Sequence, residues 1–391
     1  MRYITADYLF PISSAPIKEG VIVVDDAGKI TGIGLREDFK GKKLEIYEGI
    51  LIPGFINTHC HLELSHMKGK VDTGTGLVPF ITSVVSFRAA ADEEIKKAIQ
   101  TGDERMIQEG IVAVGDISNK ADTAGQKLKS SIKYYTFVEM FDFMNDEMAD
   151  ATLQQYQPVF EAHSDENGNK KSFVPHAPYT VSKALFQHVN RLNKDDSTIS
   201  IHNQETPSEE EIFLSKTGAM VEFYKGFNLP LDQFEPTGKS SIHYAIENLN
   251  PNRRTLFVHN TLTQPEDIQA AHDWNDRVYW ATCPNANLYI ENRLPNYRFF
   301  MDKNAKMTIG TDSLTSNWQL SILEEMKTIA RFQSYIPLET LLQWATLNGA
   351  EALGFEEELG SLEVGKIPGV NLLNIGDDLK IKPDTFVKKI V

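Results

Sequence analysis

The sequence predicts an α/β fold, a (β/α)8 TIM barrel, together with a small β-sandwich domain formed from both chain ends. The 391 residues suit a barrel of about 250 residues plus a smaller companion. After Gly54, short apolar runs alternate with longer segments of helical pattern, and eight such runs can be counted. The stretches on either side are rich in β pattern and poor in helical pattern. We therefore expect domain boundaries at residues 1–53, 54–357 and 358–391.

The N-terminal stretch predicts antiparallel strands. Residues 20–34 read as two strands around the turn signal Asp26-Ala27-Gly28, and residues 43–54 continue the strand pattern. The eight expected barrel strands are residues 55–61, 110–118, 134–141, 172–179, 198–205, 255–261, 278–285 and 306–313. Segments such as 92–110 and 265–275 have the apolar spacing of surface helices. Residues 359–376 return to β pattern, so we expect them to rejoin the N-terminal strands.

Composition limits the classes of partner. The chain has 39 basic and 54 acidic residues, a net charge of −15, which argues against nucleic-acid and anionic-membrane surfaces. No apolar run approaches the roughly 20 residues of a membrane span, and the start lacks a signal-peptide pattern. Two cysteines, Cys60 and Cys283, cannot build a disulfide framework, which fits a reducing cytoplasm. We expect a cytoplasmic protein with a small-molecule substrate; a homodimer is left open.

Polar residues fall at the C-terminal ends of the expected strands. In chain order they are His59 and His61, His176, His202 and Glu205, His259, Asn285, and Asp312. This rim is where barrel active sites form. Because side chains alternate along a strand, His59 and His61 point to one side and can chelate a metal, whereas Cys60 points to the other.

The pattern resembles the amidohydrolase superfamily, in its mononuclear aminohydrolase (deaminase) branch. The resemblance rests on "GFINTHCH", the "IHNQE" around His202, the "VHN" around His259 and the "GTDS" around Asp312, and it spans almost the whole chain. It implies a barrel inserted between two halves of a β-sandwich. It also implies that the metal ligands are His59, His61, His202 and Asp312, with Glu205 and His259 as the catalytic pair.

The chemistry can be argued from the residue types. Three neutral imidazoles and one carboxylate leave a divalent metal with a net charge near +1 and room for a water, whose pKa can fall to about 7. Loss of an amine from an aromatic ring also requires proton delivery. Glu205 is suitably placed to protonate a ring nitrogen, His259 to orient the attacking hydroxide, and Asp312 to accept its proton.

We expect one metal, zinc or iron. Binuclear relatives usually bridge two metals through a carboxylated lysine or a glutamate at the end of the fourth strand. Here that position is His176, which we expect to face the substrate. A structural role in a rigid His-Ala-Pro-Tyr turn is the alternative for His176.

The loops resemble those of deaminases acting on adenosine-like nucleosides. "HAPYTVS" and "TDSLTSN" place His176 and Ser316 at the substrate, and the loop after the first strand looks like the aminodeoxyfutalosine deaminases, with Arg88 facing a substrate carboxylate. A solvated arginine at a helix end is the alternative for Arg88. The alternatives for function are guanine deamination, triazine dechlorination, cyclic-amide hydrolysis, and an inactive metal-binding scaffold.

Overall fold

The computed structural model describes residues 1–391 and contains all eight predicted barrel strands. They are β8 (Phe55–Cys60), β9 (Ile111–Ser118), β10 (Lys133–Met140), β11 (Lys170–Pro175), β12 (Thr198–Asn203), β13 (Arg254–His259), β14 (Val278–Thr282) and β15 (Lys306–Ile309). Hydrogen bonds between parallel strands give the orders β11-β10-β9-β8 and β12-β13-β14-β15.

The two parallel sheets close into one barrel through contacts at the strand ends. The backbone N–H of His202 donates to the carbonyl of His176 at 2.9 Å, which joins β12 to the end of β11. The N–H groups of Thr311 and Asp312 both donate to the carbonyl of His59 at 3.0 Å, which joins the end of β15 to β8. The predicted TIM-type barrel is therefore confirmed, and its closing contacts are made by candidate site residues.

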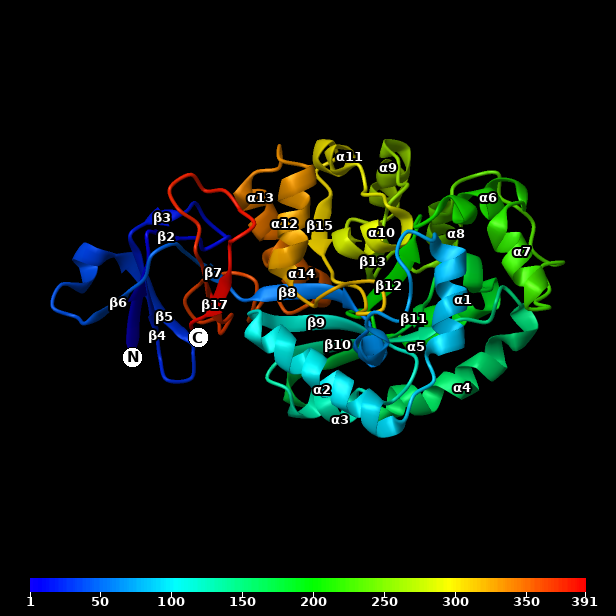
Figure 1. The fold of residues 1–391 in the computed structure, drawn as a ribbon, viewed down its shortest axis with the longest axis horizontal. Coiled ribbons are helices and arrows are strands. Elements are labelled where there is room, and N and C mark those ends of the chain that lie inside the picture. Colours follow the sequence, from blue (N-terminus) through cyan, green and yellow to red (C-terminus); the bar gives the residue numbers. More distant parts are fainter.

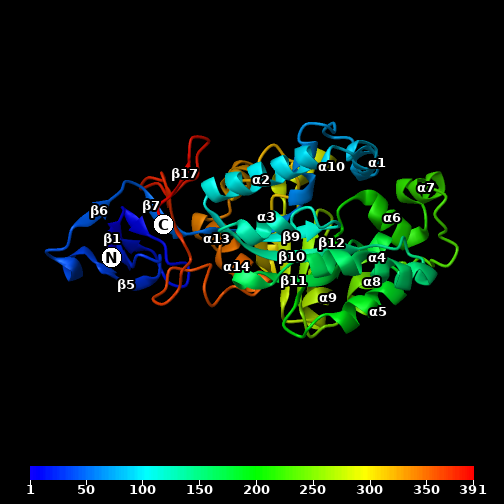
Figure 2. The same ribbon diagram turned by 90° about the horizontal axis from the view of Figure 1, so that it is seen from below.

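The helices cover the barrel strands (Figure 1, Figure 2). They are α1 (Leu77–Phe87), α2 (Asp92–Gln108), α3 (Ala124–Lys129), α4 (Ala149–Ala162), α5 (Lys183–Leu192), α6 (Pro207–Ser215), α7 (Ala219–Gly226), α8 (Ser241–Asn248), α9 (Pro265–Trp274), α10 (Pro284–Glu291), α11 (Tyr297–Asp302), α12 (Ile322–Phe332), α13 (Leu338–Ala345) and α14 (Leu347–Leu353). Short 3-10 helices are η1 (Arg36–Phe39), η2 (Leu62–Met67), η3 (Asp146–Met148), η4 (Glu166–Gly168) and η5 (Pro178–Thr180). No helix combines the length and the hydropathy that a membrane-spanning segment requires.

Helix α2 illustrates why these segments are helical. It buries Ile95, Ile99 and Met106, whose spacing of four and seven residues places them on one face. Acidic residues fill its first turn and Arg105 its last turn, which complements the helix dipole. Helix α5 begins at the cap Ser182, whose hydroxyl accepts the N–H of Leu185.

The chain ends form two further sheets at one end of the molecule, where both termini lie (Figure 1, Figure 2). The first contains β1 (Arg2–Thr5), β4 (Gly20–Val24), β5 (Ile30–Leu35) and β6 (Leu44–Ile46). The second contains β2 (Tyr8–Leu9), β3 (Ile17–Lys18), β7 (Ile50–Pro53), β16 (Val370–Leu373) and β17 (Val387–Lys389).

The expected return of the C-terminal strand pattern to the N-terminal strands is confirmed. Strand β16 pairs antiparallel with β7, so that Val370 lies opposite Pro53. The two sheets share a small hydrophobic cluster that includes Ile4 and Ile22 from one sheet and Leu51 from the other. This cluster is distinct from the large core, which extends from the barrel into the second terminal sheet through Ile50 and Ile52 of β7 and Leu373 of β16.

Candidate metal centre and active site

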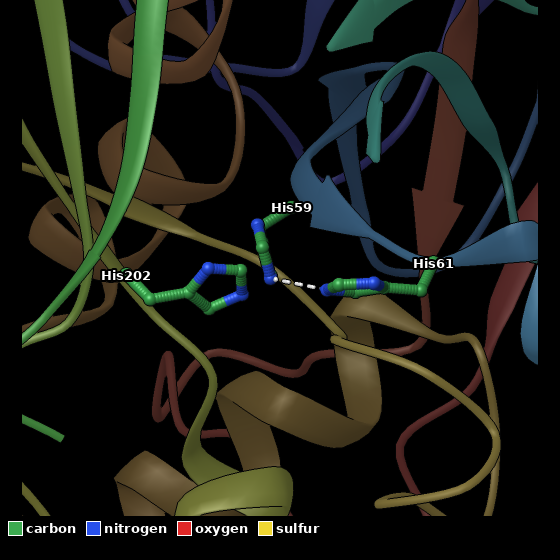
Figure 3. A group of neighbouring side chains, drawn as sticks. All are labelled: His59, His61 and His202. Carbon is green, nitrogen blue, oxygen red and sulfur yellow. Dashed lines mark hydrogen bonds between the residues drawn. The ribbon is translucent and has the colours of Figure 1, made fainter. Parts of the chain in front are cut away.

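The predicted ligands converge at the C-terminal ends of three barrel strands. His59 lies near the end of β8, His61 directly after it, His202 in β12 and Asp312 just after β15. Figure 3 shows the imidazole rings of His59, His61 and His202 directed toward one another. All of these side chains are buried or nearly so. Cys60 is buried but belongs to none of the clusters of potential ligand atoms, as strand alternation predicted.

The distances fit a shared metal. His59 Nε2 lies 3.1 Å from His61 Nε2. Asp312 Oδ1 lies 3.5 Å from His59 Nε2 and 3.3 Å from His61 Nε2. Ligand atoms about 2.0–2.1 Å from one metal and separated by angles of about 90–120° lie about 2.9–3.6 Å apart. The three measured separations fall within that range, so the donor set fits a divalent metal.

Burial keeps the imidazoles neutral, the state in which they can bind a metal. Burial is the main cause that lowers the pKa of His61 to about 4 and that lowers the pKa of His59 and His202. Burial alone would raise the pKa of Asp312, but its contact with His59 and the nearby His61 and His259 rings lower it overall. Asp312 is therefore an anion beside neutral rings.

Hydrogen bonds fix the ring orientations. His202 Nδ1 lies 2.8 Å from the carbonyl oxygen of His176; a carbonyl can only accept, so Nδ1 carries the proton and Nε2 is left free. His259 Nδ1 likewise lies 2.8 Å from Asn287 Oδ1, which leaves its Nε2 free. Partners of this kind set the tautomer of metal-binding and catalytic histidines.

The predicted role of Asn285 as the polar residue of strand 7 is not what the structure shows. The strand ends at Thr282 and α10 begins at Pro284. Asn285 turns away and donates to Glu325 Oε1 at 2.9 Å, whereas Asn287 reaches His259. In the sequence, the only sign of the residue that contacts His259 was a second asparagine, Asn287, two positions after Asn285.

Glu205 and His259 lie together beside the ligands. Glu205 Oε1 is 3.6 Å from His259 Nε2. Burial, with Asp312 nearby, raises the pKa of Glu205 well above its ordinary value, which favours the protonated form of the carboxyl. Glu209 of α6 accepts the N–H of Glu205 at 2.8 Å and that of Gln204 at 2.9 Å, which holds this loop against the helix.

The backbone is strained at the same strand ends. Gln204, His259, Asn260 and Asp312 have φ angles of 47°, 71°, 57° and 56°. Non-glycine residues seldom adopt this left-handed conformation, which costs of order 1–3 kcal/mol each. These left-handed residues gather at the C-terminal ends of β12, β13 and β15. The surrounding structure therefore holds the backbone of the site in a conformation that it would seldom adopt by itself.

The turn after His61 is anchored by a buried ion pair. Asp116 Oδ1, in β9, accepts the N–H of Leu62 at 2.8 Å. Its other oxygen pairs with Lys127 Nζ at 2.6 Å, and both side chains are almost fully buried. Because Leu62 directly follows His61, this pair fixes where the second histidine points.

Three of the four ligands, His61, His202 and Asp312, line a 310 Å³ cavity that is also lined by His176 and Arg88. The Arg88 guanidinium lies 3.6 Å from Glu63 Oε1, and its backbone carbonyl contacts His66 Nε2 at 2.9 Å, which ties the end of α1 to η2. Ser316 does not line the cavity; it is fully buried and its hydroxyl donates to Asp312 Oδ2. Ser313 is the serine of this loop that lines the cavity.

Polar lining residues that were not predicted from the sequence include Glu139, near the end of β10, and Asn119, just after β9. Burial raises the pKa of Glu139 to about 8 and that of Glu63 to about 7. The detectable signal for Glu139 was an acidic residue inside the apolar run 137–141.

Besides the clusters that His59 forms with His61 and His202 and with His259 and Asp312, a further cluster of potential ligand atoms contains Glu139, His176 and His202. His202 Nδ1 is already committed to a carbonyl, and His176 Nδ1 lies 2.7 Å from Thr180 Oγ1. This further cluster therefore has fewer free donors than the first.

Comparison with known proteins gives a family and a fold. The amidohydrolase family matches residues 50–389. An adenosine deaminase from Helicobacter pylori is 28% identical over 356 residues, covering 88% of this chain and 84% of the relative. An aminodeoxyfutalosine deaminase from Nitratiruptor is 28% identical over 358 residues, covering 88% and 83%.

Two solved structures share the fold. Helicobacter pylori aminofutalosine deaminase in complex with methylthio-coformycin superposes with a TM-score of 0.83 at 23% identity, covering 98% of this chain and 94% of that one. An adenosine deaminase from Xanthomonas campestris with bound zinc gives 0.76 at 22% identity, covering 96% and 85%.

Proposed function

The chain belongs to the amidohydrolase family and is a hydrolase acting on C–N bonds, and we propose that it deaminates an adenine-type nucleoside. One observation carries this proposal. Four potential metal ligands lie together with the Glu205 carboxyl, whose pKa burial raises, and with a neutral His259, and most of these residues line a cavity with many apolar side chains. Deamination of a ring needs these three elements: an activated water, a proton donor and a group that orients the water.

We propose a single divalent metal, zinc in the first place and iron as the alternative. His59, His61, His202 and Asp312 would hold it, and three imidazoles with one carboxylate suit either ion. When bound, the metal would lower the pKa of a water toward 7 and so supply the nucleophile. Metal analysis of the purified protein should give about one metal per chain. Two per chain would contradict the proposal.

The side chains would divide the proton transfers. Glu205, neutral before reaction, would give its proton to the ring nitrogen next to the attacked carbon. His259, neutral and held by Asn287, would hold the attacking water in place through its free Nε2. Asp312, an anion, would accept the proton that this water loses and make it available to the departing amine.

Aminodeoxyfutalosine is the substrate that we propose first. Its distal carboxyphenyl group would lie among the apolar side chains of α1 and α7 that line the cavity, which include Phe80, Val84 and Phe223. The Arg88 guanidinium has five N–H groups and only a long contact to Glu63, so it can also bind a substrate carboxylate. Similarity to the Nitratiruptor deaminase supports this choice.

We also infer the outer boundaries and location. Residues 54–357 would form the barrel domain, and residues 1–53 with 358–391 the β-sandwich, because the two terminal sheets share their own core. A cytoplasmic location is supported by Cys60 and Cys283, both buried and unpaired.

A substrate panel tests the proposal. Ammonia release should be measured with adenosine, aminodeoxyfutalosine, guanine, a chlorinated triazine and a cyclic amide, with metal removed and then restored. We expect metal-dependent ammonia release from the adenine nucleosides. Turnover of only the triazine or the cyclic amide would contradict the deaminase assignment, and no turnover with a full metal site would indicate an inactive scaffold.

A further inference from the structure

A buried carboxyl outside the cavity accepts hydrogen bonds from two segments that carry site residues. Glu325, in α12, is fully buried and does not line the cavity. Its Oε2 accepts the backbone N–H of Asn285 at 2.8 Å. Its Oε1 accepts the side-chain amides of Asn285 at 2.9 Å and of Asn317 at 2.8 Å. Glu325 therefore joins the start of α10 to the loop after β15.

The start of α10 leads to His259. Asn285 and Asn287 both lie in the first turn of this helix, and Asn287 Oδ1 is 2.8 Å from His259 Nδ1. Thr328 of α12 donates to Asn285 Oδ1 at 2.6 Å, so α12 holds Asn285 through its amide oxygen as well. A displacement of this turn would change the direction in which the His259 ring points.

The loop after β15 leads to Asp312. The amide nitrogen of Asn317 that contacts Glu325 also donates to the backbone carbonyl of Thr311 at 2.7 Å. This carbonyl belongs to the peptide group that joins Thr311 to Asp312, and the N–H of the same group donates to the carbonyl of His59 at 3.0 Å. Both polar atoms of the peptide group are thus held. These two hydrogen bonds keep Asp312 in its left-handed conformation, with φ at 56°.

We propose that Glu325 is a positioning residue that aligns His259 with Asp312. The inference rests on the proposed function for the roles of these two groups. A carboxyl oxygen can accept an N–H group whether or not the carboxyl carries a proton, whereas an amide nitrogen cannot accept. In Glu325→Gln at least one of the three N–H donors therefore loses its acceptor, and the start of α10 or the loop after β15 is released.

The first experiment compares two buried carboxyls. Asp103→Asn is the matched control, because Asp103 of α2 is 1% exposed, does not line the cavity, and accepts side-chain donors from Gln126, Ser130 and Tyr134. Both variants should lower Tm. At saturating zinc and well below each Tm, Glu325→Gln should lower kcat for the best nucleoside about 10- to 100-fold and change KM less. Asp103→Asn should keep kcat within about twofold of wild type; an equally small effect of Glu325→Gln would overturn the proposal.

A double-mutant cycle shows whether Glu325 acts through Asn287. Asn287→Leu removes the acceptor of His259 Nδ1 by itself. If Glu325 acts through that contact, Glu325→Gln should lower kcat clearly less in the Asn287→Leu background than in wild type. The same factor in both backgrounds would overturn the His259 half of the proposal.

Zinc affinity tests the Asp312 half without any substrate. Asn317→Ala removes the amide that joins Glu325 to the Thr311 carbonyl. The zinc Kd, measured by competition with a chelator, should rise about 10- to 100-fold in Asn317→Ala and in Glu325→Gln but stay within about threefold in Asp103→Asn. An unchanged Kd in the first two would overturn this half. Absence of nucleoside turnover by wild type would instead count against the proposed function, because the Kd values do not depend on it.

Discussion

Replacement of Glu205 by glutamine tests the catalytic assignment with little disturbance of the fold. Burial raises the pKa of Glu205 well above its ordinary value and so favours the neutral carboxyl. Glutamine conserves the size of the side chain and matches the charge of that neutral form. The loop is held through the backbone N–H of Glu205 to Glu209, a contact that the substitution does not touch. What the glutamine lacks is the ability to transfer a proton.

The expected loss follows from that single difference. General acid–base catalysis by a positioned side chain contributes about 10²–10⁴-fold to the rate. This corresponds to about 2.7–5.5 kcal/mol in the activation free energy of the reaction. Because Glu205 is not among the clustered potential ligands, metal content should remain as in wild type. The assay is kcat for ammonia release at saturating nucleoside, with metal content and Tm measured on the same sample.

Glu211→Gln is the matched control, since Glu211 is an exposed carboxylate on the same helix as Glu209. It should leave kcat within about twofold. Near-normal turnover in Glu205→Gln would refute the assignment of Glu205 as the proton donor. Loss of metal in that variant would instead make Glu205 a ligand.

Other predictions concern the distal group, the histidine partner, pH and metal. Arg88→Ala should raise KM for a carboxylated nucleoside by the equivalent of about 1.5–3 kcal/mol and change kcat less, whereas unchanged KM would exclude Arg88 from binding. Asn287→Leu removes the acceptor of His259 Nδ1, so kcat should fall about 10- to 100-fold with metal retained; loss of metal would make His259 a ligand. Burial raises the pKa of Glu325 to about 8, so the folded state binds this proton more tightly than the unfolded state and its stabilisation is lost as pH rises from about 4.5 to 8. Burial lowers the pKa of His61 to about 4, so stability is lost in the opposite direction as pH falls below about 6.5. The Tm of the metal-free protein should therefore fall between pH 6.5 and 8, and less steeply in Glu325→Gln; a rising Tm would contradict these signs. Zinc should raise Tm in proportion to the logarithm of its free concentration, and no shift would contradict the metal site.

Residue patterns were sufficient for the strands and their order. Each barrel strand is a short apolar run bounded by polar or turn residues, and the strand direction places His59, His202 and Asp312 at the same rim. The pairing of β16 with β7 also followed from the return of β pattern near the C-terminus. The strands can be predicted because they depend on local periodicity. Their order can be predicted because repeated strand–helix units fit few topologies other than a barrel.

Side-chain directions beyond the strand ends could not be read in the same way. Asn285 and Asn287 would share a face if the strand continued, but α10 begins at Pro284. At 100° per residue, positions two apart on a helix point to nearly opposite sides. The strand ends three residues earlier than expected, and Asn287 of the helix that follows, not Asn285, contacts His259.

Long-range contacts were also inaccessible. Arg88 was expected to face a substrate carboxylate, and it lines the cavity. Its contact with Glu63, which joins the end of α1 to η2, is set by tertiary packing and could not be predicted. Ser316 was expected at the substrate, and the turn after β15 places its hydroxyl within hydrogen-bond distance of Asp312 Oδ2, a contact that the sequence did not indicate. Contact of His176, Arg88 or Ser316 with a substrate stays a prediction.

Isotope incorporation tests the central claim, that a metal-activated water replaces the amine of an adenine-type ring, most directly. Adenosine or aminodeoxyfutalosine is incubated with the metal-loaded protein in water enriched in oxygen-18, and product and ammonia are measured together. We predict one ammonia per product molecule, with the heavy oxygen at the ring carbon that carried the amine, and neither product after the metal is removed. Ammonia without heavy oxygen in the ring, or undiminished turnover by the metal-free protein, would contradict the account.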